Sequence, residues 1–338
     1  MSCARTFFHG EAMQNVPTRI GPYRLGRLLG KGALSQVYLA VDERNGQNYA
    51  LKLTPIPSEG EDRVSRRALC RNEAFVLFTA RHPGIVTPRD FIEEEAFSAL
   101  TMSLAGKVTL EQVLKQQGKI PLPFVLEIGI RICTALQHLH TLCDEAGNPL
   151  GITHNDLKPG NLLLGRSGHV FLIDFGVVTF PWSFHELSEN QTMGTPLYTS
   201  PEQALGRITE LDARSDLFAL GGVLVELTLN KHPFHGYPTS FDTMKGIVAD
   251  TYQALAFTSN HLKDAGCGRM IPIIRGLLQK DPRDRFPSAR QLELALRACK
   301  KELVGSTKKH QALFTRFYRR WCKRVTRTPS HKPTSCLA

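Results

Sequence analysis

The sequence predicts an α+β fold in which a small sheet lobe is followed by a larger, mostly helical lobe. Between Tyr23 and Leu53, short runs rich in Val, Tyr and Leu are separated by Gly or Asn, a pattern typical of strands and turns. From Leu110 onward, apolar residues recur at spacings of three and four, which predicts helices. Strands that come first and helices that follow favour two lobes of different make-up.

Local signals assign the elements in chain order. An acidic start followed by "RRALCRNEAFVLF" predicts a helix between Ser58 and Thr79. The last helix opens with "SARQ", a capping box in which Ser288 and Gln291 can satisfy each other's free backbone donors. That last helix is expected over 288–303, and the other expected helices are 124–142, 218–228 and 271–279. The expected strands are 23–29, 35–42, 48–54, 90–92 and 97–104.

The composition is that of a soluble globular protein, with 338 residues of which 42% are hydrophobic and 22% charged. The eight cysteines include no C-x-x-C pair, which argues against zinc clusters and a disulfide framework and favours free thiols in a reducing compartment. No long apolar core follows the first residue, so we expect no signal peptide. We therefore expect a cytoplasmic protein.

The apolar run from Leu217 to Leu229 is the longest in the chain. It is 13 residues long and contains Glu226, so it is too short to span a bilayer and predicts a buried helix. Cys336 lies one position too late for a prenylation motif. We expect no transmembrane segment and no lipid anchor of this kind.

Most of the positive charge lies in the C-terminal tail. The formal net charge is +11, and residues 304–338 contain nine Lys and Arg but no Asp or Glu, which leaves +2 for the rest of the chain. Over about 311–327 we expect a basic amphipathic helix. Its aromatic stripe favours docking on the helical lobe; the functional alternatives are an acidic partner or an anionic membrane surface, and nucleic acid is not expected. The apolar stripe is Phe314, Phe317, Tyr318, Trp321 and Val325, and the opposite face carries Arg316, Arg319, Arg320, Lys323 and Arg327.

The stretch "LGKGALSQV" lies between two expected strands. Gly30 and Gly32 allow a tight turn whose backbone N–H groups can approach phosphate oxygens. On the next strand, "YALK" places Lys52 in an apolar context, where a lysine needs an anion. Glu73 on the following helix is a candidate partner that would leave Lys52 facing a ligand phosphate. From these residues alone, a solvated Lys–Glu surface pair is an equally good interpretation.

The stretch "ITHNDLKPGN" combines charged and amide side chains in an apolar run, and it fits phosphoryl transfer. Asp156 would accept the hydrogen of an incoming hydroxyl, Lys158 would balance charge on the transferring group, and Asn161 would hold a metal ion. Asp174 in "FLIDFGVV" follows an apolar strand-like run, where its carboxylate can bind Mg²⁺. The ordered set is difficult to explain as structure alone.

In this order, the motifs resemble those of the eukaryotic-like (Hanks-type) serine/threonine protein kinase family, and especially its bacterial members. "TPLYTSPE" resembles the family's "APE" segment, and the resemblance covers roughly 20–303. In the family, the residue matching Asp216 braces the catalytic loop, which here is the stretch around Asp156. The residue matching Arg285 pairs with the motif glutamate, here Glu202. Lys158 and Thr195 resemble Ser/Thr-directed members. The resemblance implies a two-lobed fold with a small antiparallel-sheet N-lobe that carries one main helix, and a larger, mostly helical C-lobe.

The same resemblance implies domain boundaries and an ATP site. It implies an N-terminal extension over 1–19, an N-lobe over about 20–104, a C-lobe over about 105–303 and a basic tail over 304–338. ATP with Mg²⁺ would lie between the lobes, the hinge would be the backbone of Ser103 to Ala105, and protein substrates would receive the phosphoryl group. The implied nucleotide-binding residues are Leu29, Gly30, Gly32, Ser35, Val37, Ala50, Lys52, the gatekeeper Met102, and Leu163; the implied catalytic residues are Asp156, Lys158, Lys52 and Glu73; the implied metal ligands are Asn161 and Asp174.

Two residues depart from the family pattern. Ser35 replaces the third loop glycine, and we expect a modest effect on ATP binding. Asn155 replaces the arginine that commonly receives an activation-loop phosphate, and a neutral amide cannot form the same charge-assisted pair. We therefore hypothesise that activity does not depend on loop phosphorylation acting through Asn155, although Ser183, Ser188 and Thr192 could still be modified.

Two other functions remain to be weighed against an active protein kinase. One is a non-catalytic scaffold of the same fold, a pseudokinase. The chain retains Lys52, Glu73, Asp156, Asn161 and Asp174, which argues against it. The other is a small-molecule phosphotransferase with related lobes. The "SPE" segment together with Arg285 argues against this alternative, because in the family those parts build a platform for peptide substrates.

Overall fold

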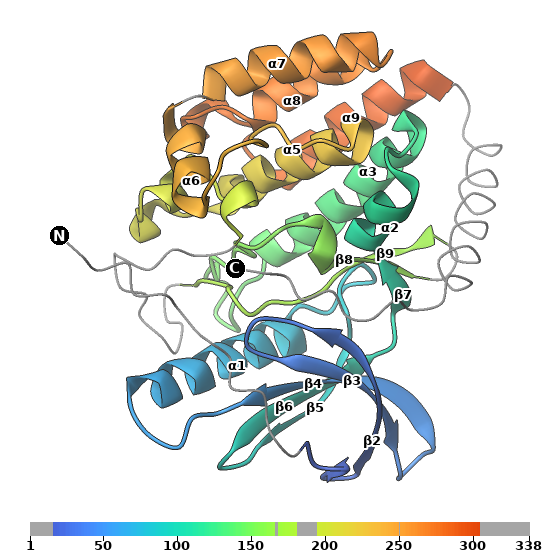
Figure 1. The fold of residues 1–338 in the computed structure, drawn as a ribbon, viewed down its shortest axis with the longest axis vertical. Helices are drawn as coiled ribbons and strands as arrows, with labels where there is room; N and C mark the ends of the chain where they lie inside the picture. Colours follow the sequence, from blue (N-terminus) through green and yellow to red (C-terminus); the bar gives the residue numbers. More distant parts are fainter. Residues whose placement is uncertain (1–15, 166–167, 181–194, 250, 305–338) are drawn as a thin grey trace.

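The computed structural model describes residues 16–165, 168–180, 195–249 and 251–304, and it shows a sheet lobe joined to a larger helical lobe (Figure 1). The predicted two-lobed fold is confirmed. The expected tail helix over 311–327 and the candidate phosphorylation sites Ser183, Ser188 and Thr192 lie outside the described residues. The strands are β1 (Arg19–Ile20), β2 (Tyr23–Lys31), β3 (Gln36–Asp42), β4 (Gln47–Pro55), β5 (Pro88–Glu93), β6 (Phe97–Ser103), β7 (Gly106–Thr109), β8 (Leu162–Gly165) and β9 (Val170–Leu172).

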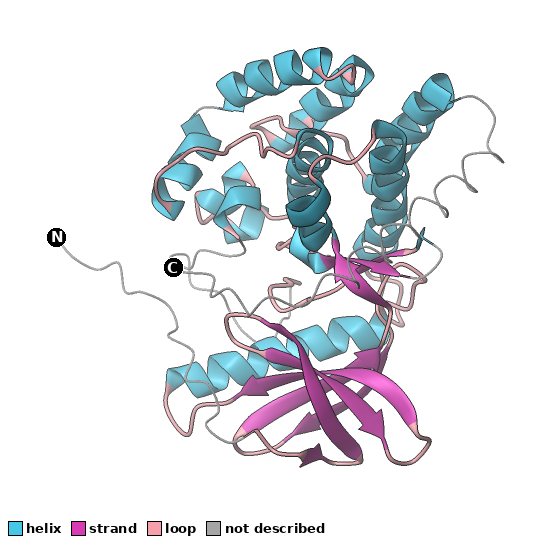
Figure 2. Ribbon diagram, turned by 45° about the vertical axis from the view of Figure 1, so that its right-hand side comes forward, coloured by secondary structure: helices cyan, strands magenta, loops and turns pink. Residues whose placement is uncertain are grey.

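The N-lobe is an antiparallel sheet with the strand order β1-β2-β3-β4-β6-β5. One of its faces is closed by a small cluster around the buried side chains of Tyr23, Leu51 and Leu53. The helix α1 (Glu61–Thr79) accompanies the sheet, and Figure 2 shows it lying across the sheet on the side that faces the helical lobe. The alternation of β4 therefore divides its side chains between the small cluster and the region between the lobes.

The C-lobe is built mainly from helices. The C-lobe follows the hinge in the chain. Besides its helices, it contains a separate three-stranded sheet made of β7, β8 and β9. Short 3-10 turns over 159–161, 196–198 and 208–210 connect them near the predicted catalytic residues. The helices are α2 (Leu110–Gln117), α3 (Leu122–His140), α4 (Pro201–Ala204), α5 (Ala213–Leu229), α6 (Ser240–Ala249), α7 (Thr251–Asp264), α8 (Ile271–Leu277) and α9 (Ala289–Val304).

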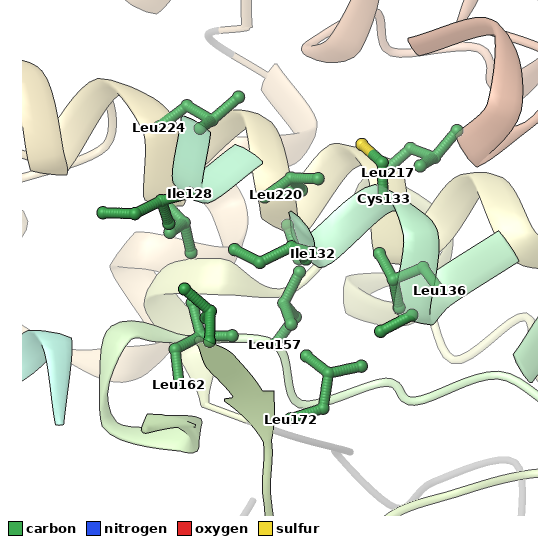
Figure 3. Packing of buried hydrophobic residues seen from close by; sticks show 14 of the residues in the cluster. Ile128, Ile132, Cys133, Leu136, Leu157, Leu162, Leu172, Leu217, Leu220 and Leu224 are labelled. Atoms are coloured by element: carbon green, nitrogen blue, oxygen red, sulfur yellow. The ribbon is translucent and has the colours of Figure 1, made fainter. Parts of the chain in front are cut away.

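The core of the C-lobe forms where α3 and α5 pack together over the strands that carry the catalytic loop. Figure 3 shows Ile132 of α3 between Leu220 of α5 and Leu157 of the loop, with Ile128 and Leu136 to either side along α3, and all five belong to one buried cluster. Leu157, the residue directly after Asp156, is fully buried and anchors the loop in the core. Burying side chains of this size contributes roughly 2 kcal/mol each, so the catalytic loop is fixed to the lobe by packing as well as by hydrogen bonds.

The helix α3 is the one helix in the described part of the chain that is long and apolar enough to cross a membrane by length and composition alone. Most of it is buried within the protein, where it packs against α5 and α9. It is the core helix of the C-lobe. The apolar run at 217–229 lies in α5 and is mostly buried, as predicted.

The predicted elements agree with the structure, with small changes at their ends. The helix expected between Ser58 and Thr79 begins at Glu61, and the one expected over 288–303 is α9. The structure shows one half of the predicted capping box, in which the Gln291 backbone N–H donates to Ser288 Oγ (3.3 Å). Complete capping boxes start α2, at Thr109, and α4, at Ser200.

Candidate active site

The predicted Gly-rich loop is the tip of the β2–β3 hairpin. Gly32 donates its backbone N–H to the Ser35 carbonyl oxygen (2.8 Å), and Gly30 lies opposite Val37 in the strand register. A Cβ at Gly30 would meet no atom within 4 Å, and Leu29 beside it is 37% exposed. The hairpin therefore leaves open space in which its backbone N–H groups can approach a ligand.

Four of the predicted nucleotide-binding residues share one face of the N-lobe sheet. Val37 pairs with Lys52 and Ala50 pairs with Met102, and paired residues of antiparallel strands point to the same side. Ala50 and Lys52 are two positions apart on β4, so all four side chains lie on that face. Leu163 comes from β8 in the C-lobe. The predicted adenine-binding residues are thus contributed by both lobes.

The predicted hinge lies between β6 and β7. Ala105 donates its backbone N–H to the Ser103 carbonyl oxygen (3.0 Å). Directly after the hinge, Gly106 packs so closely on β8 that an added Cβ would lie 2.2 Å from the Leu164 carbonyl oxygen. Only glycine can occupy this position without moving the backbone, so close packing fixes where the chain enters the C-lobe.

Lys52, Glu73 and Asp174 come from three separate elements and meet between the lobes. Lys52 Nζ donates to both carboxylate oxygens of Glu73 (2.7 and 2.8 Å) and to Asp174 Oδ1 (2.7 Å). Only 12% of the Lys52 side chain and 6% of the Glu73 side chain are exposed, compared with 44% for Asp174. The interpretation of Lys52 and Glu73 as a solvated surface pair is therefore wrong.

The three side chains share one positive charge between two carboxylates. Burial disfavours the charge on Lys52, but Asp174 and Glu73 outweigh burial and raise the pKa of Lys52. Burial raises the pKa of Glu73, which Lys52 only partly offsets because Asp174 adds a like charge. Burial also acts against ionised Asp174, yet Lys52 lowers its pKa to about 2. The cluster holds one carboxylate more than it holds cations, which makes it a favourable place for a metal cation.

Asp156 is held by three neighbouring donors. Its Oδ2 accepts from Lys158 Nζ (2.7 Å) and Asn161 Nδ2 (2.9 Å), and its Oδ1 accepts from Thr195 Oγ1 (2.8 Å). Lys158 also donates to Thr195 Oγ1 (2.6 Å). An ionised carboxylate offers about four acceptor sites, so Asp156 is oriented on three sides and retains capacity for an incoming hydroxyl.

Asp174 has an unusual backbone conformation. Its φ is 66°, in the left-handed region that few residues other than glycine adopt. A Cβ on Gly176, two residues later, would lie 3.3 Å from Asp174 Oδ1 and 3.7 Å from Lys52 Nζ. The turn therefore directs the Asp174 carboxylate toward Lys52, and a glycine beside it leaves the room that both groups need.

Two further predicted residues, Asp216 and Glu202, make buried contacts that support the site. Asp216 on α5 accepts the backbone N–H groups of His154 (2.9 Å) and Asn155 (2.8 Å), and it also contacts His140 Nε2 (2.7 Å). This carboxylate braces the catalytic loop, as the resemblance implied. Glu202 accepts two hydrogen bonds from Arg285 (2.7 and 2.8 Å), and both side chains are almost completely buried.

Sequence analysis missed several contacts. The sequence marks Thr195 only as typical of Ser/Thr-directed members, whereas in the structure it bridges Asp156 and Lys158. Gln203 donates to the Asn155 carbonyl oxygen (3.1 Å), and Thr179 accepts a hydrogen bond from the Asn155 side chain. The motif "SPEQ" matches the capping-box pattern and could have identified Gln203. No local pattern marks Thr179.

The predicted metal ligands fit Mg²⁺ by their chemistry. Asp174 supplies a carboxylate that is partly exposed, and both hydrogen bonds found for the Asn161 side chain use its nitrogen, which leaves the amide oxygen for a ligand. Within the described ranges, no group of three His, Cys, Asp or Glu side chains gathers to bind a metal by itself. Mg²⁺ commonly uses one or two protein ligands together with substrate phosphates and water, and this donor set is of that kind.

Comparison with known proteins identifies the family. The family model described as "Protein kinase domain" matches residues 23–295, which is most of the chain. This chain belongs to the protein kinase family. Its relatives include a probable serine/threonine-protein kinase of Streptomyces coelicolor, which is 30% identical over 330 residues, covering 95% of this chain and 45% of that protein. The serine/threonine-protein kinase PknA of Mycobacterium tuberculosis is 34% identical over 224 residues, covering 65% of this chain and 49% of PknA.

The predicted resemblance to bacterial serine/threonine kinases is confirmed by these relatives. A probable serine/threonine-protein kinase of Clostridium perfringens is also similar, with 28% identity over 280 residues and coverage of 83% of this chain and 38% of that protein. The chain spans less than half the length of these curated relatives.

Proposed function

We propose that the chain is a serine/threonine protein kinase that transfers the γ-phosphoryl group of ATP to Ser or Thr hydroxyls of proteins and also phosphorylates itself. The observation that carries this proposal is the meeting of Lys52 with Glu73 and Asp174, at hydrogen-bond distances of 2.7–2.8 Å. Protein kinases need this Lys–Glu ion pair and a metal-binding Asp in place together.

In this proposal, the N-lobe binds and orients the nucleotide. Leu29, Val37, Ala50, Met102 and Leu163 enclose the adenine, and their placement on facing elements of the two lobes supports that role. The hairpin at Gly30, Gly32 and Ser35 covers the phosphates, and Lys52 contacts the phosphate oxygens while Glu73 keeps it in position.

The catalytic loop then aligns the two reacting groups. Asp156 orients the substrate hydroxyl and accepts its proton, and Lys158 stabilises charge on the transferring group from a position beside Asp156. Asn161 and Asp174 hold Mg²⁺, which when bound neutralises charge on the phosphates. Most of the rate enhancement then comes from positioning and electrostatic stabilisation.

The alternatives are supported less well. A pseudokinase would not require Asp156 to be held by Lys158, Asn161 and Thr195 together. A small-molecule phosphotransferase would not require the buried Glu202–Arg285 pair that anchors α4, the segment that forms the peptide platform in the family.

Several further properties belong to the proposal. The kinase domain spans 20–303, with an extension over 1–19 and a basic tail over 304–338. The tail docks on the C-lobe or binds an acidic partner or an anionic membrane surface, and the protein acts in signalling in the cytoplasm. Its substrates are proteins.

The test is phosphate transfer from labelled ATP with Mg²⁺, comparing the wild type with Asp156→Ala on itself and on a generic basic protein. We expect label on Ser and Thr in the wild type and a loss of about 10³-fold in the variant. Circular dichroism checks that the variant is folded, and chelation of Mg²⁺ should abolish the label. A wild type that binds ATP but transfers no label would favour the pseudokinase.

A further inference from the structure

A small cavity lies between α1 and the N-lobe sheet, beside the Lys52–Glu73 pair. Besides these two side chains, its wall includes Thr54 of β4, Ser98 of β6 and Cys70 of α1. Its accessible space corresponds to about one water molecule. The cavity therefore adjoins the proposed active site, but these three further residues have no part in the proposed chemistry.

The register of the sheet and the turn of the helix bring the wall together. Thr54 pairs with Ser98 across the β4–β6 ladder, and Lys52 lies two positions before Thr54 on β4. Paired residues of antiparallel strands, and residues two apart on one strand, point to the same side. Cys70 and Glu73 are three apart on α1, so they share one face of the helix. The cavity thus lies between one face of the sheet and one face of α1.

The wall contains a buried hydroxyl without a partner. Ser98 is 2% exposed, and its Oγ has no hydrogen-bond partner among the described residues. Thr54 and Cys70 are buried as well and bring a second hydroxyl and a thiol to the same space. A buried hydroxyl that lacks a partner destabilises a fold, and buried water molecules commonly satisfy such groups. Two hydroxyls and a thiol are sufficient partners for one water molecule.

The charges around the cavity favour a neutral occupant. Both carboxylate oxygens of Glu73 accept from Lys52, and the more exposed carboxylate, Asp174, does not line the cavity. Burial raises the pKa of Cys70 and the Glu73 carboxylate raises it further, so this group is a neutral thiol. An ion would therefore meet charges that already have partners, and an apolar molecule would leave the Ser98 hydroxyl unsatisfied.

We propose that this cavity binds one ordered water molecule, which forms hydrogen bonds with the Ser98 hydroxyl, the Thr54 hydroxyl and the Cys70 thiol. The water molecule joins β4 and β6 to the turn of α1 that carries Glu73. The site goes beyond the proposed kinase function, because it depends only on the folded N-lobe.

The direct test is a crystal structure of the full chain at a resolution that shows ordered water. We expect a water peak within hydrogen-bond distance of Ser98 Oγ and Cys70 Sγ. A cavity without such a peak would overturn the proposal. Xenon bound in the cavity under pressure would overturn it as well, because dry apolar cavities are the ones that take up xenon.

Two matched hydroxyl deletions test the site in solution. Thr101 also lies on β6 but points to the opposite face from Ser98, and its Oγ1 is likewise buried without a partner among the described residues. Ser98→Ala should lower the folding equilibrium constant by about fivefold, because the hydrogen bond to the water molecule is lost. Thr101→Val should not lower it, because an unsatisfied hydroxyl is replaced by a methyl group. Urea unfolding measures both, and a Ser98→Ala variant as stable as the wild type would mean that no water molecule binds this hydroxyl.

A double-mutant cycle tests whether one water molecule joins the two elements. Ser98→Ala and Cys70→Ala each remove a partner of the same water molecule, so the double variant should lose less stability than the sum of the two single losses. Additive losses would show that the two residues share no ligand and would overturn the proposal.

Hydrogen exchange tests the link to α1. The amides at 70–74 should exchange about fivefold faster in Ser98→Ala than in the wild type, and at the wild-type rate in Thr101→Val. Equal rates in Ser98→Ala and the wild type would contradict the link. All these measurements are made without phosphate transfer, so their outcome is independent of whether the chain is an active kinase.

Discussion

Two of the buried ion pairs in the described part of the chain have nearly the same nitrogen–oxygen distances, but the pKa values of their glutamates shift in opposite directions. In the active site, Lys52 Nζ lies 2.7 Å from Glu73 Oε1. In α4, Glu202 Oε1 lies 2.7 Å from Arg285 Nη1. The pKa of Glu73 is raised, because burial and the nearby Asp174 outweigh Lys52. The pKa of Glu202 is lowered, because its hydrogen bonds to Arg285 outweigh burial.

The difference lies in how the charges are balanced. Glu202 has its own cation, with two hydrogen bonds from Arg285 and a third from the Ser215 hydroxyl (2.7 Å). Glu73 shares Lys52 with Asp174. A buried pair whose charges balance holds its two segments together, and removing one partner destabilises the fold. A cluster with an excess carboxylate is instead stabilised when a cation binds beside it.

The largest expected effect comes from breaking the balanced pair. Glu202→Gln keeps the shape of the side chain but leaves the buried Arg285 without a counter-charge. We expect a loss of about 3–5 kcal/mol in the free energy of unfolding, and a decrease in Tm of about 10 °C for a domain of this size. Urea unfolding and a thermal melt measure both.

A matched control uses an exposed pair of the same chemistry. Glu210 lies 3.4 Å from Arg207, and both side chains are more than half exposed. Glu210→Gln should change stability by less than about 1 kcal/mol. If Glu202→Gln were as stable as this control, the buried pair would not be a structural joint.

The same substitution in the active-site cluster should act on activity instead. Glu73→Gln removes the excess negative charge and leaves Lys52 paired with Asp174, so stability should change by less than about 1 kcal/mol. Lys52 loses the group that orients it, and kcat/KM should fall by about 10²-fold. Kinase assays and urea unfolding of one preparation test this split. The exposed Glu61→Gln at the start of α1 serves as control, and a fully active Glu73→Gln would contradict the proposed role of the pair.

Sequence analysis could predict both pairs because short motifs carry them. Lys52, Asp156 and Asp174 each lie within a motif whose neighbours set their position, and the order of the motifs supplies the partners. The balance of charge around each pair could not be predicted, because it depends on distances between elements and on burial. Only the structure shows that Lys52 reaches Asp174 as well as Glu73.

The neutral contacts of the site were harder still to predict. Thr195 and Asp156 are 39 residues apart, and Gln203 and Asn155 are 48 apart, so no local sequence pattern connects the partners. For Asn155, the sequence showed that a charge was missing but not which bonds replaced it. Those bonds follow from the left-handed backbone at Asn155 and from the bridge at Thr179, which are features of the folded chain.

The smallest and sharpest effect should be the pH dependence of stability, which is expected to have opposite signs at the two glutamates. The pKa of Glu202 lies below its ordinary value of 4.5, so its contribution is fully present above pH 4.5 and is lost as pH falls through the folded-state pKa. The pKa of Glu73 lies above 4.5, so its contribution is present below pH 4.5 and is lost as pH rises through the folded-state pKa.

Urea unfolding without Mg²⁺, over about pH 3.5 to 6, measures each variant against the wild type. The stability advantage of the wild type over Glu202→Gln should grow with pH, and its advantage over Glu73→Gln should shrink. Parallel slopes would mean that the two pairs are balanced alike, and the excess carboxylate would then give the active site no preference for a metal cation.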